Sequence, residues 1–243
     1  MKTLIIIPSR MSATRLPGKP LLKINGLSIV SHVSKKAVEA NIGDVIVATE
    51  DKEIFEDVKK NGFNAIITSN KHMTGTDRIF EAFKKSNIKN VDFIMNLQGD
   101  EPAINAKDIV DLNFKMIKTK SKMGTLAGKI KNSKDLQNKN IVKVITEKSF
   151  EVDKFPKAIS FLRYSKNIEN IFHHVGVYCY SVETLNKLIN LNQSKNEIES
   201  RLEQLRAMDN KIEINVSQAS SVSIGVDTEE DYLELKNIME YKN

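Results

Sequence analysis

Three basic residues, Arg10, Arg15 and Lys19, follow a short apolar run near the N-terminus. The run, residues 4–7, is rich in isoleucine, which is typical of a fully buried strand. The segment that holds the cations, residues 8–20, contains proline and glycine, which disfavour both helix and strand. A fixed loop at the carboxyl end of a buried strand is where open α/β sheets bind ligands. Because three like charges repel each other unless an anion lies between them, the segment predicts a polyphosphate site.

This loop differs from the known phosphate-binding motifs. A P-loop requires the pattern G-x-x-x-x-G-K-[ST], whereas Gly18 is the one glycine here and Lys19 is followed by Pro20. The dinucleotide fingerprint G-x-G-x-x-G is absent as well. Side-chain charge must therefore contribute more to phosphate binding than glycine amides do. On charge alone, a solvated basic loop remains the alternative.

Two aspartates stand where a Mg²⁺ ligand is expected. Asp100 follows the strand-like residues 91–95 in a turn with glycine and proline, and Asp227 follows an apolar residue before a helix. Mg²⁺ takes one or two protein carboxylates and completes its shell with water and phosphate oxygens. For Asp227 the alternative is an ordinary helix start beside Thr228. No His/Cys cluster has zinc spacing, so we expect no transition metal.

Six ordered motifs resemble the sugar-acid cytidylyltransferases, and they span nearly the whole chain. Their order is most similar to the branch of the family that activates 3-deoxy-D-manno-octulosonate (Kdo). The motifs are residues 7–10 (IPSR) with 14–21 (TRLPGKPL), 72–78 (HMTGTDR), 96–102 (NLQGDEP), 174–178 (HVGVY), 202–206 (LEQLR) and 225–228 (GVDT).

The resemblance implies a Mg²⁺-dependent nucleotidyltransferase. Such an enzyme transfers CMP from CTP to the anomeric hydroxyl of Kdo and releases pyrophosphate, for lipopolysaccharide biosynthesis. It implies CTP and a 2-keto-3-deoxy sugar acid as partners, and a homodimer. The implied catalytic residues are Arg15, Lys19 and Asp100, with Asp100 and Asp227 as metal ligands. The implied nucleotide-binding residues are Pro8, Ser9, Arg10, Lys19, Thr74, Arg78 and Gln98. The implied sugar-binding residues are Arg163, His174, Tyr178, Glu203 and Gln204.

The sugar side is where the chain departs from the family pattern. Arg163 follows a strand-like segment and could bind a carboxylate with its planar fork, but the segment between it and His174 is shorter than usual. The alternatives are therefore another sugar acid (8-amino-Kdo or an acylneuraminate) or a non-catalytic CTP-binding regulator. For single residues, Tyr178 fits a core aromatic, His174 a satisfied strand histidine and Thr74 a helix cap.

Composition limits the other function classes. The chain has 243 residues, a net charge of +6 and one cysteine. The excess charge is lysine scattered over helix faces, with no basic block interleaved with aromatics, so we expect no nucleic-acid partner. The N-terminal apolar run is too short for a signal peptide and no stretch is long enough to span a membrane, so we expect a cytoplasmic protein without membrane contact. A single cysteine also fits a reducing compartment.

Strand-like and helix-like segments alternate along the chain, which favours a mostly parallel central sheet covered by helices. The resemblance implies a single Rossmann-like nucleotide-diphospho-sugar transferase domain over residues 1–243. Residues 123–180 are richer in strands, and we expect there a sugar-binding and dimerisation subregion. Strands at 45–48, 65–67 and 91–95 precede helices that open near Asp51, Thr76 and Ala106, and further helices are expected at 198–208 and 229–241.

Overall fold

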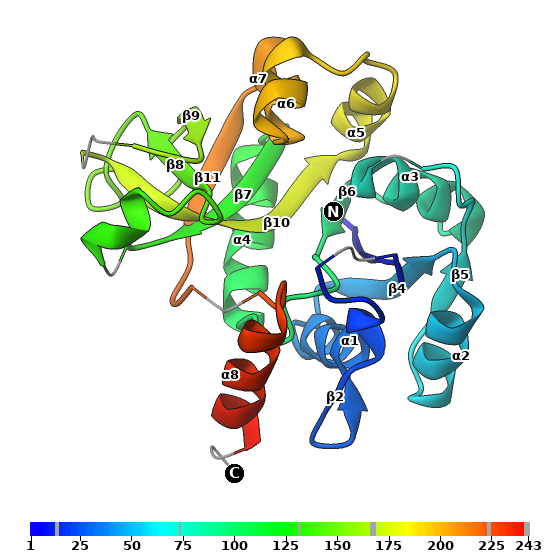
Figure 1. The fold of residues 1–243 in the computed structure, drawn as a ribbon. Helices are drawn as coiled ribbons and strands as arrows, with labels where there is room; N and C mark the ends of the chain where they lie inside the picture. Colours follow the sequence, from blue (N-terminus) through cyan, green and yellow to red (C-terminus); the bar gives the residue numbers. More distant parts are fainter. Residues whose placement is uncertain (13–14, 73, 131, 166–168, 223–224, 241–243) are drawn as a thin grey trace. The chain divides into compact units, whose positions relative to one another are not determined.

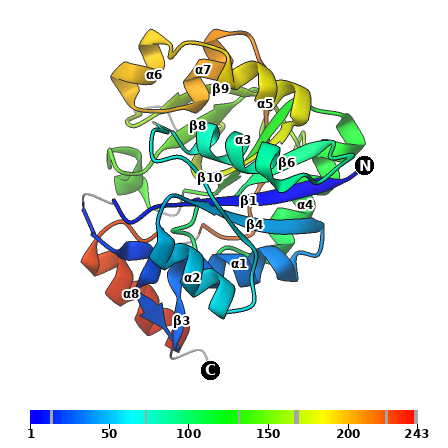
Figure 2. The same cartoon turned by 90° about the vertical axis from the view of Figure 1, so that its right-hand side faces the viewer.

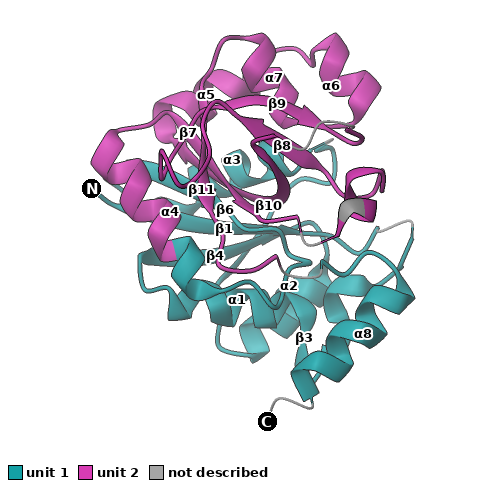
Figure 3. Cartoon of the chain, turned by 90° about the vertical axis from the view of Figure 1, so that its left-hand side faces the viewer, with its two compact units in different colours: residues 1–109, 223–243 teal, residues 110–222 magenta. Residues whose placement is uncertain are grey.

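The computed structural model describes residues 1–12, 15–72, 74–130, 132–165, 169–222 and 225–240. The chain separates into two units (Figure 3): residues 1–109 with 223–243, and residues 110–222. It passes from the first unit to the second within one helix, α4 (Ala106–Thr119). The division into two units does not test whether residues 1–243 form a single domain, which stays a prediction.

The sheet of the first unit is built from parallel strands. Its order is β6 (Phe93–Asn96), β1 (Thr3–Ser9), β4 (Gly43–Thr49) and β5 (Ala65–Ile67), and each neighbouring pair runs parallel. Residues 4–7 in β1 have no exposed surface, as expected for a continuous apolar strand covered on both faces. The helix-covered parallel sheet confirms the predicted α/β class, and it brings the carboxyl ends of these strands to one edge.

Helices cover this sheet. The first unit contains α1 (Ile29–Glu39), α2 (Lys52–Lys60) and α3 (Gly75–Ser86), and α1 and α3 both pack on β1 and β4 (Figure 1). The predicted starts near residues 51, 76 and 106 are confirmed to within one residue. Asp51 stands at the N-cap position of α2, and the Thr74 side chain caps α3.

A small hydrophobic cluster joins the cationic loop to the C-terminal helix. The loop continues through a short 3-10 turn, η1 (Lys19–Leu21), into the hairpin β2 (Lys23–Ile24) and β3 (Leu27–Ser28). Figures 1 and 2 show α8 (Glu229–Glu240) beside this hairpin. The cluster consists of Ile24, Ile29, Val226 and Leu235, with Leu16 and Leu22 packed against it. It fixes the segment after Val226 against the loop, although the two are about 200 residues apart in sequence.

The helix α8 begins where the sequence predicts. Thr228 accepts a hydrogen bond from the Asp231 amide at 3.2 Å, and the Asp231 carboxylate accepts from the Thr228 amide at 2.8 Å. These two bonds form the capping box that the spacing indicates. Residue 241, the predicted last residue of this helix, lies outside the described part of the chain.

The second unit holds a mixed sheet. Its order is β11 (Ile214–Gln218), β7 (Met123–Gly128), β10 (Ile171–Ser181), β8 (Lys143–Thr146) and β9 (Ala158–Leu162). The pair β11–β7 is parallel and the other pairs are antiparallel. Four of the five strands fall in or within one residue of the expected strand-rich region 123–180. The remaining elements are η2 (Ser133–Leu136), α5 (Val182–Ile189), α6 (Lys195–Ser200) and α7 (Gln204–Asp209).

The prediction of one helix over residues 198–208 is wrong. The helix breaks into α6 and α7 at Arg201, whose φ of 53° is left-handed. The cause is a competing hydrogen-bond donor. The Arg163 guanidinium donates to the carbonyl oxygens of Ser200 and Arg201 at 2.8 and 3.1 Å. A continuous helix would need those carbonyls for its own amides. The break puts Gln204 at the start of a helix instead of in the middle of one.

None of the helices in the described ranges combines the length and the hydropathy that crossing a bilayer requires.

Candidate functional site

The two predicted metal ligands meet at one ammonium group in the first unit. Lys19 Nζ donates to Asp100 Oδ2 at 2.7 Å and to Asp227 Oδ1 at 3.3 Å. Arg15 Nη2 pairs with the other oxygen of Asp227 at 2.9 Å. The Lys19 side chain is 11% exposed, whereas that of Arg15 is 56% exposed. Two of the three cations of the loop, Arg15 and Lys19, are thus paired with the protein's own carboxylates.

Local backbone geometry places Lys19. Gly18 precedes it at φ 72°, a left-handed conformation that glycine adopts without strain. The Gly18 amide donates to the Met11 carbonyl at 3.4 Å, and the Lys19 amide to the Leu16 carbonyl at 3.2 Å. These bonds fold the loop back on itself, so that Lys19 opens the 3-10 turn with its side chain toward Asp100. Residues 13 and 14 of the loop lie outside the described residues.

Asp100 is positioned by a close approach between two strand ends. A Cβ atom on Gly99 would lie 2.9 Å from the Pro8 carbonyl oxygen and 3.3 Å from Ser9 Cβ, so only glycine fits there without a shift. The Val226 amide donates to the Asp100 carbonyl at 2.9 Å, which fixes Asp227 beside it. The adjacency of β1 and β6, together with this hydrogen bond, therefore brings three distant motifs together.

Two buried polar atoms at this sheet edge lack a hydrogen-bond partner among the described residues. They are Ser9 Oγ at the end of β1 and Asn96 Oδ1 at the end of β6. An unpaired buried polar atom is costly, so each such atom points to a ligand. Ser9 was predicted to contact the nucleotide, whereas Asn96 was not. The signal for Asn96 was its place as the first residue of the 96–102 motif. Of the other predicted nucleotide residues on this edge, Pro8 and Gln98 are half-buried and Arg10 is exposed.

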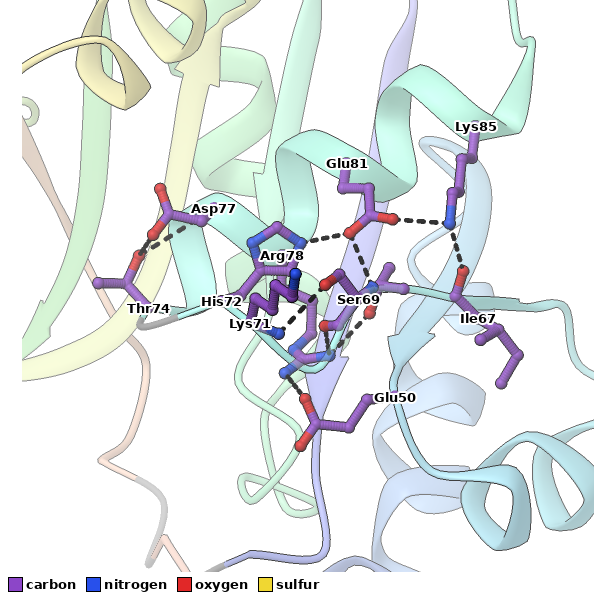
Figure 4. A network of polar contacts seen from close by, with 11 residues as sticks. Glu50, Ile67, Ser69, Lys71, His72, Thr74, Asp77, Arg78, Glu81 and Lys85 are labelled. Carbon is purple, nitrogen blue, oxygen red and sulfur yellow. Dashed lines mark hydrogen bonds and ion pairs between the residues drawn. The ribbon is translucent and has the colours of Figure 1, made fainter.

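Thr74 lies beside the same edge. A Cβ atom on Gly75 would be 3.6 Å from Pro8 Cγ, which places the start of α3 against the end of β1. Thr74 Oγ1 accepts from the Asp77 amide at 3.2 Å and donates to Asp77 Oδ2 at 2.8 Å (Figure 4). The residue is therefore a helix cap, and its hydroxyl is held by a single neighbour on α3.

Arg78 is buried and bound to the protein. Its Nη1 donates to Thr68 Oγ1 at 2.7 Å and to the Ser69 carbonyl at 3.4 Å, and its Nη2 pairs with Glu50 (Figure 4). Thr68 and Glu50 directly follow β5 and β4, so the guanidinium ties these strand ends to α3. The contact of Arg78 with a nucleotide stays a prediction. The observed role of this side chain is to hold the segment that leads to Thr74.

Glu81 holds the same segment from the next turn of α3. Its carboxylate accepts from the Ser69 amide at 2.9 Å and from Lys85 at 2.6 Å, and it pairs with His72 (Figure 4). Burial alone would raise the pKa of Glu81, but the bonds from Lys85, His72 and the Ser69 amide outweigh it and lower the pKa to about 2. Sequence reasoning missed this network, because only the fold brings residues 69–72 onto the side of α3.

In the second unit, Arg163 binds backbone carbonyls. In addition to its bonds with residues 200 and 201, its Nη1 donates to the Lys139 carbonyl at 3.2 Å. Most of the guanidinium that we expected to bind a carboxylate therefore donates to backbone carbonyls of the protein itself. The contact between Arg163 and a carboxylate of the sugar acid stays a prediction. Arg163 lies next to the turn that carries Glu203 and Gln204, so the structure brings these three predicted residues together.

A buried lysine, Lys143, donates a hydrogen bond to the backbone carbonyl of Arg163. Lys143 has no exposed surface, and its Nζ donates to the carbonyls of Asn138, Ile141 and Arg163 at 2.6, 2.8 and 3.0 Å. Burial lowers the pKa of Lys143, and the charge of Asp135 opposes the shift. Sequence reasoning missed this residue, because a lysine in a lysine-rich chain carries no signal of burial.

His174 and Tyr178 lie side by side on β10, with ring centroids 5.4 Å apart. His174 Nε2 is 3.0 Å from Thr125 Oγ1, whose own proton goes to the Val177 carbonyl at 2.7 Å. His174 must therefore donate from Nε2, which leaves Nδ1 as an acceptor. Burial, with a smaller contribution from the charge of His173, lowers the pKa of His174 to about 3. A neutral imidazole suits contact with a sugar hydroxyl.

The turn between α6 and α7 ends in a buried amide. Gln204 is buried at the first position of α7, and its Nε2 has no partner within the described ranges. Glu203 stands at the N-cap position. Arg206 is bound to Glu197 through two bonds of 2.8 and 2.6 Å inside the unit, which is a structural role. Gln204 Nε2 is thus a buried donor that a sugar hydroxyl could use.

The requirement for Mg²⁺ stays a prediction. In the part of the chain that the structure describes, no group of three or more His, Cys, Asp or Glu side chains is placed to hold a metal ion. A two-carboxylate pair remains compatible with Mg²⁺, because that ion keeps several water and phosphate ligands. Cys179 is buried with its pKa raised by desolvation, so its thiol is unsuited to nucleophilic attack.

Comparison with known proteins agrees with this geometry. The chain matches the cytidylyltransferase family model over residues 4–214. It is 38% identical to the 3-deoxy-manno-octulosonate cytidylyltransferase of Thermodesulfovibrio yellowstonii, over 95% of each chain. It is 37% identical to the protein of the same name from Rhizobium etli, over 97% of this chain and 94% of that one.

Solved structures agree as well. The fold is similar to that of CMP:2-keto-3-deoxy-manno-octonic acid synthetase complexed with CTP, with a TM-score of 0.90 and 32% identity over the full length of both chains. The apo form of a UDP-glucose pyrophosphorylase shares the fold, with a TM-score of 0.72 at 13% identity. These comparisons confirm the resemblance carried by the six motifs. The chain therefore belongs to the cytidylyltransferase family.

Proposed function

We propose that this protein transfers CMP from CTP to the anomeric hydroxyl of Kdo and releases pyrophosphate. The observation that carries the proposal is the convergence of Lys19, Arg15, Asp100 and Asp227 at the carboxyl edge of a parallel sheet. The relatives named above support the choice of CTP and Kdo. In the reaction the hydroxyl oxygen loses its proton and forms a bond to the α-phosphorus, and the bond between that phosphorus and the oxygen bridging it to the β-phosphate breaks. Such a displacement depends on positioning and charge neutralisation.

The cationic loop would hold the phosphates. The side chains of Lys19 and Arg15 are already held in one conformation by carboxylates. They could therefore bind phosphate oxygens with little further loss of side-chain entropy. Their charge would face the leaving pyrophosphate, which gains negative charge in the transition state. Ser9 Oγ and Asn96 Oδ1, the two unpaired buried atoms described at this sheet edge, would contact the nucleoside.

We also propose that Mg²⁺ is required. Asp100 and Asp227 would hold the ion, since both carboxylates already converge on a single cation. When bound, Mg²⁺ supplies charge neutralisation at phosphate oxygens.

The sugar acid would be bound by the second unit. Gln204 Nε2 and the Nδ1 acceptor of His174 offer a donor and an acceptor for hydroxyls, and Arg163 and Tyr178 adjoin them. We further propose a homodimer, a cytoplasmic location and a role in lipopolysaccharide biosynthesis. Light scattering that gives a stable 27.5 kDa monomer at micromolar concentration would contradict the dimer.

A pyrophosphate-release assay tests the function. The purified protein is given CTP with Kdo, 8-amino-Kdo or N-acetylneuraminate, and then Kdo with each of the four NTPs, with and without EDTA. We expect release with CTP and Kdo that EDTA abolishes. Asp100→Asn should reduce the rate by at least about a hundredfold and keep the fold, whereas Asp92→Asn, at an exposed position bound to the Lys2 amide, should not. Preference for neuraminate, or no release with any acid, would overturn the proposal.

A further inference from the structure

The turn between α6 and α7 is held by Arg163, and Arg163 is held by a buried lysine. We infer that Lys143 is a positioning residue for the sugar acid. Acting through Arg163, it keeps the turn in the conformation that puts Gln204 at the first position of α7. The inference rests on the proposed function and adds to it a residue that sets the affinity for the sugar acid without touching it.

Lys143 fixes Arg163 in two ways. Its Nζ donates to the Arg163 carbonyl at 3.0 Å, which holds the backbone of Arg163 just after β9. It also donates at 2.6 and 2.8 Å to the carbonyls of Asn138 and Ile141, on either side of Lys139 in the sequence. The Lys139 carbonyl accepts from Arg163 Nη1 at 3.2 Å. One ammonium group, which has three protons, therefore places both the backbone of Arg163 and an acceptor of its guanidinium.

The Arg163 guanidinium prevents the helix from continuing. In a continuous helix the carbonyls of Ser200 and Arg201 would accept from amides four residues later. Both accept instead from Arg163, through Nε and Nη2 at 2.8 and 3.1 Å. The Leu205 amide, which would have bound the Arg201 carbonyl, donates to the Leu202 carbonyl at 3.1 Å. The distant guanidinium thus takes the acceptors on which helical continuation depends.

Local sequence does not by itself favour this break. Residue 201 has a left-handed φ of 53°, yet it is arginine and not the glycine or asparagine common at such helix ends. The buried pair of Glu197 and Arg206 also ties α6 to α7. Loss of the Arg163 bonds should therefore let residue 201 relax toward a helical conformation without detaching α7. The conformation of the turn depends on the contact that Lys143 supports.

The residue that the turn positions carries an unpaired donor. Gln204 is 6% exposed, and its Nε2 has no partner in the described part of the chain. A buried polar atom without a partner points to a ligand, which in the proposed function is a sugar hydroxyl. Because α7 starts at Gln204, a change in the turn moves this amide directly. Loss of Lys143 should thus weaken binding of the sugar acid and spare CTP, whose proposed site lies in the first unit.

The kinetic experiment measures KM for Kdo and for CTP in the wild type, Lys143→Met and Arg163→Ala. We expect KM for Kdo to rise at least about fivefold in both variants, because Gln204 loses its position. KM for CTP should stay within about twofold, since the nucleotide contacts are not touched. The matched control is Lys154→Met, which removes a lysine bond of 2.7 Å to the Phe150 carbonyl in the same unit and should change neither value. Equal changes in both KM values, or none, would overturn the inference.

A rescue variant separates positioning from direct contact with the acid. Arg201→Gly allows a left-handed φ without strain, so the turn should persist when its anchor is lost. The Arg201 side chain is exposed, and the single variant should keep the wild-type KM. Added to Lys143→Met or Arg163→Ala, it should return KM for Kdo to within about twofold of the wild type. Without rescue, Lys143 contributes only general stability or Arg163 binds the carboxylate itself, and the inference is overturned.

A readout without substrate covers failure of the proposed reaction. The Cα and Cβ chemical shifts of residue 201 report its backbone conformation, and they should move from left-handed to helical values in Lys143→Met but not in Lys154→Met. If Lys143→Met does not fold, Lys143→Gln replaces it, because its amide keeps two protons but is too short to reach all three carbonyls. Unchanged shifts would contradict the inference. A wild type that releases no pyrophosphate would refute the proposed function and leave this measurement intact.

Discussion

Lowering the pH from 7 to 5 should destabilise the fold through His174. Burial on β10, near the rings of Phe161 and Tyr178, lowers the pKa of its imidazole from 6.5 to about 3. The unfolded chain therefore takes up a proton at this position as the pH falls through about 6.5, whereas the folded chain does not. Stability that is present above pH 6.5 is lost as the pH falls toward 3.

The size of this effect follows from the two pKa values. Proton uptake by the unfolded state alone lowers the free energy of unfolding by about 2 kcal/mol between pH 7 and pH 5. This is an upper bound, because residue 174 is partly accessible to solvent. Below about pH 4.5 carboxylates such as Glu81 add a separate loss, since its lowered pKa means that folding favours its charged form.

Urea unfolding at pH 5, 6 and 7 measures the effect. His174→Gln keeps a donor for Thr125 and does not titrate, so its stability should change less between pH 7 and pH 5, by up to about 2 kcal/mol. His32→Gln serves as a second probe in the other unit, because burial also lowers the pKa of His32, and the two effects should add. If the wild type and His174→Gln lose the same stability, the folded imidazole takes up its proton as easily as the unfolded one, and the reasoning is refuted.

Three further predictions concern single contacts. Lys143→Met should lower the free energy of unfolding by about 2–4 kcal/mol in urea titrations, because three buried carbonyls lose their donor; a loss below ~1 kcal/mol would show that water replaces the ammonium. Gly99→Ala should slow pyrophosphate release at least about tenfold while the CD spectrum stays native, because its Cβ meets a carbonyl at 2.9 Å and displaces Asp100; an unchanged rate would mean that the loop adapts. Lys19→Met should tighten Mn²⁺ binding to the nucleotide-free protein at least about fivefold in EPR titrations, because its ammonium no longer competes for the two carboxylates. Lys23→Met, at an exposed position, is the control, and equal affinities in all three proteins would contradict the prediction.

Sequence patterns were sufficient where local chemistry decides the structure. The isoleucine-rich run of β1 is buried as predicted, because a strand covered on both faces needs a continuous apolar sequence. The start of α8 follows from the Thr228–Asp231 spacing, since both bonds of the cap are local. Asp100 and Asp227 could be paired in advance only through the family resemblance, because 126 intervening residues separate them.

The sequence did not show which partners the arginines take. Arg78 and Arg163 were predicted to bind ligands, yet each binds groups supplied by distant segments, and residue type alone does not reveal a backbone carbonyl as the partner. For the same reason the break at Arg201 could not be predicted, since its cause is Arg163, which lies 38 residues away just after β9. The cationic loop was expected to need an external anion, yet two of its three cations, Arg15 and Lys19, pair with the protein's own Asp227 and Asp100.

The two cations that share Asp227 differ in exposure, and ionic strength should separate them. The Debye length is about 8 Å at physiological salt, and exposed ion pairs contribute only about 0–1 kcal/mol. The Arg15 pair is open to solvent, whereas Lys19 is enclosed and held by two carboxylates. We therefore expect added salt, or a polyphosphate bound as in the proposed function, to detach the outer guanidinium first. Arg15 would then bind the anion while the inner pair still holds the loop in place, and the loop would exchange its partners in sequence, from the surface inward.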